Sequence, residues 1–265
     1  MEQTMKIVIP MAGYGSRLRP HTWVRPKPLL PLAGRRVIDY ALDQFVSLPG
    51  LDRAEYVFII SPNQGDQIQQ YMQTAHPDKT VHFILQDEMK GQSHAIWKAR
   101  EHLHGPMLMS FSDTLIETDL AFLGDVTADA IAWVKPMDDP RRFGVIELDA
   151  QGRATRLVEK PGDCSNNLVL VGFYYFREGE QLVQAIEEQV RRNKSLRGEF
   201  FLADAINIML ERGVHMRKEQ ISIWLDAGIP EAVLETNRYM LDHGRDRGTL
   251  PPAKTAVTHI PPEYI

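Results

Sequence analysis

The sequence of 265 residues has no apolar run near the roughly 20 residues that a helix needs to cross a bilayer. Its single cysteine, Cys164, excludes an internal disulfide, and no Cys/His spacing fits a zinc site. The N-terminus lacks the cationic start and long apolar stretch of a secretory signal. These absences exclude a transmembrane protein, and we expect a cytoplasmic protein with no membrane partner.

Acidic residues are missing from one long stretch of the chain. Between Glu2 and Asp39 lie 36 residues without Asp or Glu, and the same stretch carries seven Lys and Arg residues. The whole chain has a net charge of −5, which argues against a nucleic-acid partner. A cation cluster on an acidic protein indicates either a site for a small, highly charged anion or a solvated basic face.

Short β-branched runs alternate with helical patterns through the first half of the chain. Runs that are apolar throughout, separated by helices, are typical of a mostly parallel sheet covered on both faces. We expect an α/β fold with strands at 6–11, 56–61, 81–86, 107–111 and 131–134 and helices at 37–45 and 93–103. A β-rich insertion should follow at 143–148, 154–158 and 168–176, then helices at 180–192, 202–212 and 230–243 and one more core strand at 221–225.

The first strand runs into the glycine-rich turn at residues 12–16. Backbone N–H groups in such a turn can face a phosphate. A dinucleotide-binding loop needs a third glycine where Leu18 stands, and the P-loop sequence G-K-[ST] is absent, so NAD enzymes and common ATPases are disfavoured. Arg17 offers a rigid fork of donors to phosphate oxygens and Lys27 a mobile point charge.

Residues 7–40 resemble the opening motif of the sugar-1-phosphate nucleotidyltransferases, which runs G-x-G-[ST]-R-L-x-P-x-T-x-x-x-P-K-P-L-L-P. Later segments extend this resemblance over about residues 5–240; they are Gln86 with 91–95, 112–113, 142–145, 159–161, 171–174, 198–200 and 224–228. It implies a Rossmann-like sheet with a β-rich sugar-binding insertion. It also implies a Mg²⁺-dependent reaction of a nucleoside triphosphate with a sugar 1-phosphate that releases pyrophosphate.

The resemblance also implies a role for each matching residue. The metal ligands would be Asp113 and Asp226. The catalytic cations would be Arg17, Lys27 and Lys160. The nucleotide would be bound by Ala12, Gly13, Gly15, Ser16, Arg17, Gln86 and Gly91, and the sugar phosphate by Gly144, Glu159, Lys160, Gly172 and Glu199. Trp224 is interpreted as a core residue, and Cys164, without a cation nearby in sequence, as no nucleophile.

Several choices stay open at this stage. The motifs favour UTP or dTTP with glucose 1-phosphate, and the alternatives are a mannose/GTP enzyme, a phosphocholine-type cytidylyltransferase and a non-catalytic nucleotide sensor. We expect a catalytic domain at 1–243 and a C-terminal extension at 244–265. Residues 258–265 resemble the entry to a left-handed β-helix. The family resemblance also makes a homo-oligomer one of the expectations.

Overall fold

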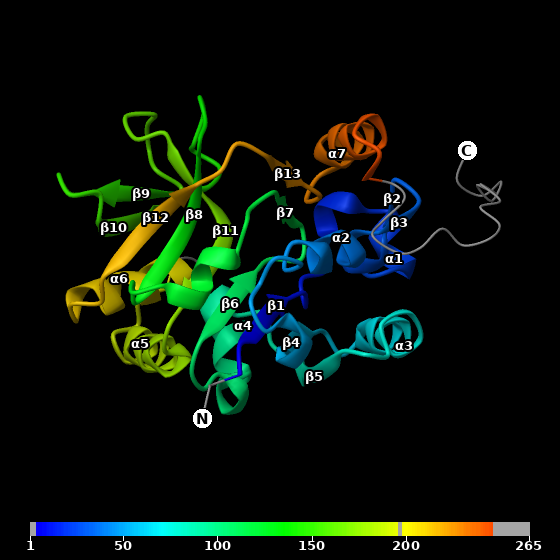
Figure 1. The fold of residues 1–265 in the computed structure, drawn as a ribbon, viewed down its shortest axis with the longest axis horizontal. Coiled ribbons are helices and arrows are strands. Elements are labelled where there is room, and N and C mark those ends of the chain that lie inside the picture. The colour runs from blue at the N-terminus through cyan, green and yellow to red at the C-terminus, as the bar shows by residue number, and fades with distance from the viewer. Residues whose placement is uncertain (1–3, 196–197, 246–265) are drawn as a thin grey trace.

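The computed structural model of the chain describes residues 4–195 and 198–245. Figure 1 shows a long sheet at the centre with helices packed along both of its faces. The sheet has nine strands. They are β1 (Lys6–Pro10), β4 (Glu55–Ile60), β5 (Thr80–Leu85), β6 (Met107–Ser110), β8 (Ala130–Pro136), β9 (Gly144–Leu148), β10 (Ala154–Glu159), β11 (Leu168–Phe176) and β12 (Met216–Gln220).

The sheet divides at the long strand β11. One edge of β11 pairs with β8, which continues to β12, while its other edge pairs first with β9 and then with β6. Beyond β6 the order is β1, β4 and β5, all parallel, and β9 forms an antiparallel hairpin with β10. Only β10 and β11 run against the other strands. The predicted mostly parallel α/β sheet is confirmed, and the β-rich segment is continuous with it.

Alternating apolar residues of the strands face two separate core layers. On β1, Val8 belongs to the layer covered by α4 (Gln92–Lys98), α5 (Gly179–Arg191) and α6 (Leu202–Glu211). Ile7 and Ile9 belong to the opposite layer, covered by α2 (Val37–Asp43) and α3 (Gly65–Ala75). Because both of its faces are buried, β1 is apolar at every position from Ile7 to Pro10.

A third apolar cluster joins α2 to the last helix, α7 (Pro230–Asp242). Two small sheets lie beside it, one of β2 (Pro31–Leu32) with β3 (Arg35–Arg36) and one of β7 (Thr114–Ile116) with β13 (Trp224–Asp226). The remaining elements are single turns: α1 (His21–Val24), η1 (Ser16–Leu18), η2 (Lys27–Leu29), η3 (Leu51–Arg53), η4 (Arg100–His102) and η5 (Ala121–Asp125).

The prediction of a core strand at 221–225 is wrong. The last strand of the main sheet is β12, five residues earlier, and residues 224–226 pair with β7 instead. β12 lies at the end of the sheet beyond β8, and its sequence, Met-Arg-Lys-Glu-Gln, is largely polar. An edge strand can keep polar side chains in solvent, so it carries no apolar run by which the sequence would reveal it.

Within the residues described, no helix is long and apolar enough to cross a membrane. The C-terminal extension predicted for 244–265 lies almost wholly outside these residues, which end at Arg245. The domain boundary at residue 243 therefore stays a prediction.

A buried carboxylate ties α2 to α3 next to the cation-rich segment. Asp39 is 6% exposed and accepts hydrogen bonds of 2.9 Å from the Arg36 backbone N–H, the Tyr71 hydroxyl and His76 Nε2. Burial alone would raise the pKa of Asp39, but these donors, His76 first, hold that pKa below its ordinary 3.8.

Asp39→Asn should lower the free energy of unfolding by about 1–3 kcal/mol at pH 7, because it removes the charged acceptor from a buried network. A lowered folded pKa means that this stabilisation is present above pH 3.8 and is lost as the pH falls through the folded value. Urea unfolding at pH 7 and pH 3 measures it, with the exposed Asp78→Asn as control. An equal deficit at both pH values would contradict this role.

Candidate active site

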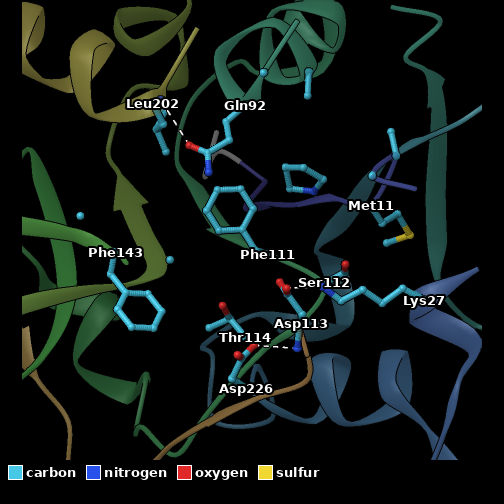
Figure 2. Close-up of a pocket in the computed structure, with 18 of the residues that line it drawn as sticks. Met11, Lys27, Gln92, Phe111, Ser112, Asp113, Thr114, Phe143, Leu202 and Asp226 are labelled. Atoms are coloured by element: carbon cyan, nitrogen blue, oxygen red, sulfur yellow. Dashed lines mark hydrogen bonds and ion pairs between the residues drawn. The ribbon is translucent and has the colours of Figure 1, made fainter. Parts of the chain in front are cut away.

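The carboxyl ends of the parallel strands form one wall of a large cavity. The segments that follow β1, β5 and β6 all meet there, because parallel strands end at the same edge of a sheet. The cavity has a volume of about 550 Å³ and extends to β10, β11 and the start of α6. Figure 2 shows Lys27, Asp113 and Asp226 on one side of it and Gln92 and Leu202 on the other.

All but one of the residues predicted for the site line this cavity. From the first loop come Ala12, Gly13, Gly15, Ser16, Arg17 and Lys27, and from the rest of the chain come Gln86, Gly91, Asp113, Gly144, Glu159, Gly172, Glu199 and Asp226. The exception is Lys160, which follows Glu159 and is exposed beside the cavity. Residues that are up to about 200 positions apart in sequence are thus brought to one place.

Two carboxylates converge at one end of the cavity. Asp113 follows β6, and Asp226 ends β13. A methyl group built on Gly228 would lie 2.8 Å from Asp226 Oδ1 and 3.1 Å from Asp113 Oδ2, so both side chains reach the same small space. The backbone holds them there, because the Ala227 N–H donates to the Asp113 carbonyl and the Gly228 N–H to Asp226 Oδ1.

The cations of the first loop balance this pair unequally. The Lys27 ammonium forms an ion pair with Asp113 Oδ2 (Figure 2). Burial raises the pKa of Asp113, but the charge and hydrogen bond of Lys27 outweigh it and leave that pKa below its ordinary value. For Asp226, burial and then the negative charge of Asp113 raise the pKa above its ordinary value. The pair therefore needs positive charge, and Asp226 more than Asp113.

The pair suits a hard divalent cation. No group of three His, Cys, Asp or Glu side chains able to hold a metal occurs within 4–195 and 198–245. Mg²⁺, however, commonly takes one or two carboxylates and completes its octahedron with waters and substrate phosphates. The convergence of the two carboxylates beside Gly228 and the raised pKa of Asp226 fit such an ion.

The glycine-rich loop presents a second cation. Its shape is held by the Thr22 hydroxyl, which donates to the Gly15 carbonyl at 2.8 Å. The Arg17 guanidinium lines the cavity and has no hydrogen bond or ion pair with any other described residue. Its charge still lowers the pKa values of Asp113 and Asp226, so it faces the same region. Such a guanidinium can bind phosphate oxygens in two places at once.

The wall opposite the carboxylates is formed by Gln86 and the segment after it. Gln86 is 4% exposed, and its amide Nε2 donates to the Gly91 carbonyl at 3.4 Å. Gly91 has a φ of +95° and touches another chain segment so closely that a Cβ would lie 2.6 Å from the Phe200 carbonyl oxygen. Only glycine fits both conditions. The cavity wall is therefore a backbone contact between two loops.

The β-rich part of the sheet forms the remaining wall. Gly172 has a φ of +82°, and a Cβ there would meet the Phe111 ring at 2.6 Å. The strand can therefore approach Phe111 this closely only because position 172 is glycine. Glu159 and Glu199 bring carboxylates to this wall. Burial raises the pKa of Glu159, and the neighbouring charge of Lys160 counteracts it. These are acceptors suited to hydroxyl groups.

Several residues that line the cavity were not predicted from the sequence to belong to the site. Trp224, interpreted as a core residue, packs on the core and also lines the cavity, where its ring meets Phe143 edge-on with centroids 5.1 Å apart. Phe111 and Thr114 flank the carboxylate of Asp113 (Figure 2). Apolar residues next to a strand end resemble any core residue in sequence, so no pattern distinguishes them.

Gly91→Ala should destabilise the protein by about 1–3 kcal/mol, because the new methyl group meets the Phe200 backbone and the φ disfavours alanine. Gly162→Ala is the matched control, since a Cβ there has no neighbour within 4 Å. Thermal unfolding of both variants measures the difference. Equal unfolding midpoints would show that the two loops do not pack as described.

The sequence is similar to several curated proteins. The bifunctional protein GlmU of Methanocaldococcus jannaschii is 32% identical over 240 residues, which cover 90% of this chain and 55% of that protein. The chain thus spans about half the length of the first curated relatives that it matches. The UTP–glucose-1-phosphate uridylyltransferase AglF of Haloferax volcanii is 29% identical over 241 residues, covering 86% of this chain and 93% of AglF.

The fold is shared with solved structures as well. The structure of a UDP-glucose pyrophosphorylase complexed with UDP-glucose superposes with a TM-score of 0.76, at 20% identity, over 91% of this chain and all of that one. The model of the family described as "Nucleotidyl transferase" matches residues 6–243, which include every predicted site residue. The chain belongs to the nucleotidyl transferase family.

Proposed function

We propose that this protein transfers a nucleotidyl group from UTP or dTTP to glucose 1-phosphate, with Mg²⁺, and releases pyrophosphate to form a nucleotide sugar. The observation that carries the proposal is the convergence of Asp113 and Asp226 in a cavity whose other walls hold Arg17 and two further carboxylates, Glu159 and Glu199. A triphosphate would be bound by Arg17 and by a metal ion held between Asp113 and Asp226. A sugar would be bound by carboxylates that accept hydrogen bonds from its hydroxyls.

The loop at 12–17 would bind the triphosphate. Its backbone N–H groups would face the phosphates, and so would the Arg17 guanidinium, which has no hydrogen bond or ion pair with another described residue. Lys27 would contact the phosphate near the reaction centre, since its ammonium already lies against Asp113. Bound Mg²⁺ would be held by Asp113 and Asp226 and would neutralise charge on the reacting phosphates.

The sugar 1-phosphate would lie against the β-rich wall. Glu159 and Glu199 would accept hydrogen bonds from its hydroxyls, and Gly144 and Gly172 would let the backbone approach the ring. Lys160 would bind its phosphate. That phosphate oxygen attacks the α-phosphorus in line, a new P–O bond forms, and the bond to the leaving pyrophosphate breaks. The nucleophile is already anionic, so catalysis is mainly positioning and charge neutralisation, without a strong general base.

Gln86 supports a pyrimidine nucleotide. It is buried at the end of the cavity, and its amide Nε2 is directed to the Gly91 carbonyl, which leaves Oε1 as an acceptor for an N–H on the ring edge of uracil or thymine. Glucose 1-phosphate is supported by the similarity to AglF. The similarity to GlmU keeps other sugar 1-phosphates among the candidates. We further propose that the enzyme is cytoplasmic and that its catalytic domain spans 1–243.

Pyrophosphate release should require both Mg²⁺ and glucose 1-phosphate and should be fastest with UTP or dTTP in a panel that also contains GTP, CTP and ATP. Removal of the metal with EDTA should stop release, and added Mg²⁺ should restore it. A second panel of sugar 1-phosphates and phosphocholine tests the acceptor. No release from folded protein that binds a nucleotide would favour a sensor instead.

Asp113→Asn should lower kcat at least about 100-fold while the fold persists, because charge stabilisation at the reacting phosphates is lost. Asp125→Asn, which changes an exposed carboxylate of η5, should leave kcat unchanged. Steady-state pyrophosphate release and circular dichroism measure the two effects. A near-normal rate for Asp113→Asn would remove this residue from the reaction.

A further inference from the structure

Lys160 has an unusual backbone conformation for a residue with a side chain. It follows β10 with a φ of +49°, in the left-handed region, and its N–H donates to the Phe143 carbonyl at 2.8 Å. This conformation costs an L-residue free energy and is usually kept where the direction of a side chain matters. Here it directs the ammonium onto an aromatic ring, with Nζ 5.1 Å from the centroid of Phe201.

The ammonium of Lys160 has no carboxylate within ion-pair distance among residues 4–195 and 198–245. Lys27, by contrast, is paired with Asp113. An aromatic face attracts a cation through the negative face of its π system. It holds the cation in place without forming an ion pair. The neighbouring Glu159 carboxylate interacts with Lys160 electrostatically but is not within ion-pair distance, so the ammonium remains able to bind a phosphate.

The backbone that carries the ring is held from both sides. Phe201 is 9% exposed and immediately precedes α6. Its carbonyl accepts a 2.9 Å hydrogen bond from Nε2 of Gln189, a fully buried residue of α5. The next N–H along the chain, that of Leu202, donates to Gln92 Oε1 (Figure 2). Phe201 is therefore fixed from both sides at the border of the cavity, between Glu199 and Leu202, which both line it.

We propose that Phe201 is a positioning residue that holds the Lys160 ammonium, without an ion-pair partner among the described residues, at the place where the sugar phosphate binds. The inference rests on the proposed role of Lys160 as a ligand of that phosphate. Phe201 acts through Lys160 and need not touch the substrate itself. Its effect must therefore vanish when Lys160 is removed, which a purely structural role of the ring would not predict.

A double-mutant cycle tests this. Phe201→Leu should raise the KM for glucose 1-phosphate about three- to tenfold, with the KM for the nucleotide unchanged, and Phe201→Tyr should stay near the original value. In a Lys160→Ala background, Phe201→Leu should change neither constant. Phe83→Leu, at a half-buried ring on β5 far from Lys160, is the matched control for lost packing. Equal effects of Phe201→Leu in both backgrounds would overturn the proposal.

A second measurement does not depend on turnover. Reductive methylation with ¹³C labels the lysines and keeps their charge. The Lys160 signal is assigned by its absence in Lys160→Arg. The ring current of Phe201 should shift that signal upfield. Phe201→Leu should abolish that shift, and Phe83→Leu should not. A Lys160 signal at the position of exposed lysines would overturn the proposal, even if the enzyme is active. An inactive protein with the shifted signal would instead refute the proposed function and leave the lysine–ring contact established.

Discussion

The arrangement of charge around Asp113 and Asp226 is the constraint on which the site depends. Two carboxylates that reach the same space repel each other, and burial makes both costly to ionise. Lys27 relieves Asp113, while Asp226 retains a raised pKa. This imbalance favours further positive charge beside the two carboxylates, which the proposed Mg²⁺ would supply. It also explains why the acid-free segment at the N-terminus must fold against the sheet edge that carries the carboxylates.

Three cations are held around the cavity in three different ways. Lys27 is paired with a carboxylate, Arg17 has no partner among the described residues, and Lys160 lies over an aromatic ring. The charge of Lys27 is partly compensated by Asp113, whereas Arg17 and Lys160 form no ion pair with another described residue. The structure thus combines one cation that is compensated by a carboxylate with two that the proposed function assigns to an anionic ligand.

Close backbone contacts shape the walls between these charges. Gly91 lies against the Phe200 backbone, and Gly172 lies against the Phe111 ring. Both contacts place strands or loops from distant parts of the sequence nearer to each other than side chains would permit. The cavity is consequently defined by main-chain geometry, which suits a ligand that is recognised through phosphate oxygens and hydroxyls.

The α/β class, the alternating strands and helices of the first half, and the loop with Arg17 and Lys27 could all be predicted from the sequence, because apolar periodicity and motif spacing are local properties. It did not reveal β12, since a polar edge strand has no apolar run. Nor did it reveal the space beside Gly228, or the ring beneath Lys160. Both features depend on which distant segments of the folded chain meet, because strand pairing and loop packing are set by contacts between residues far apart in the sequence.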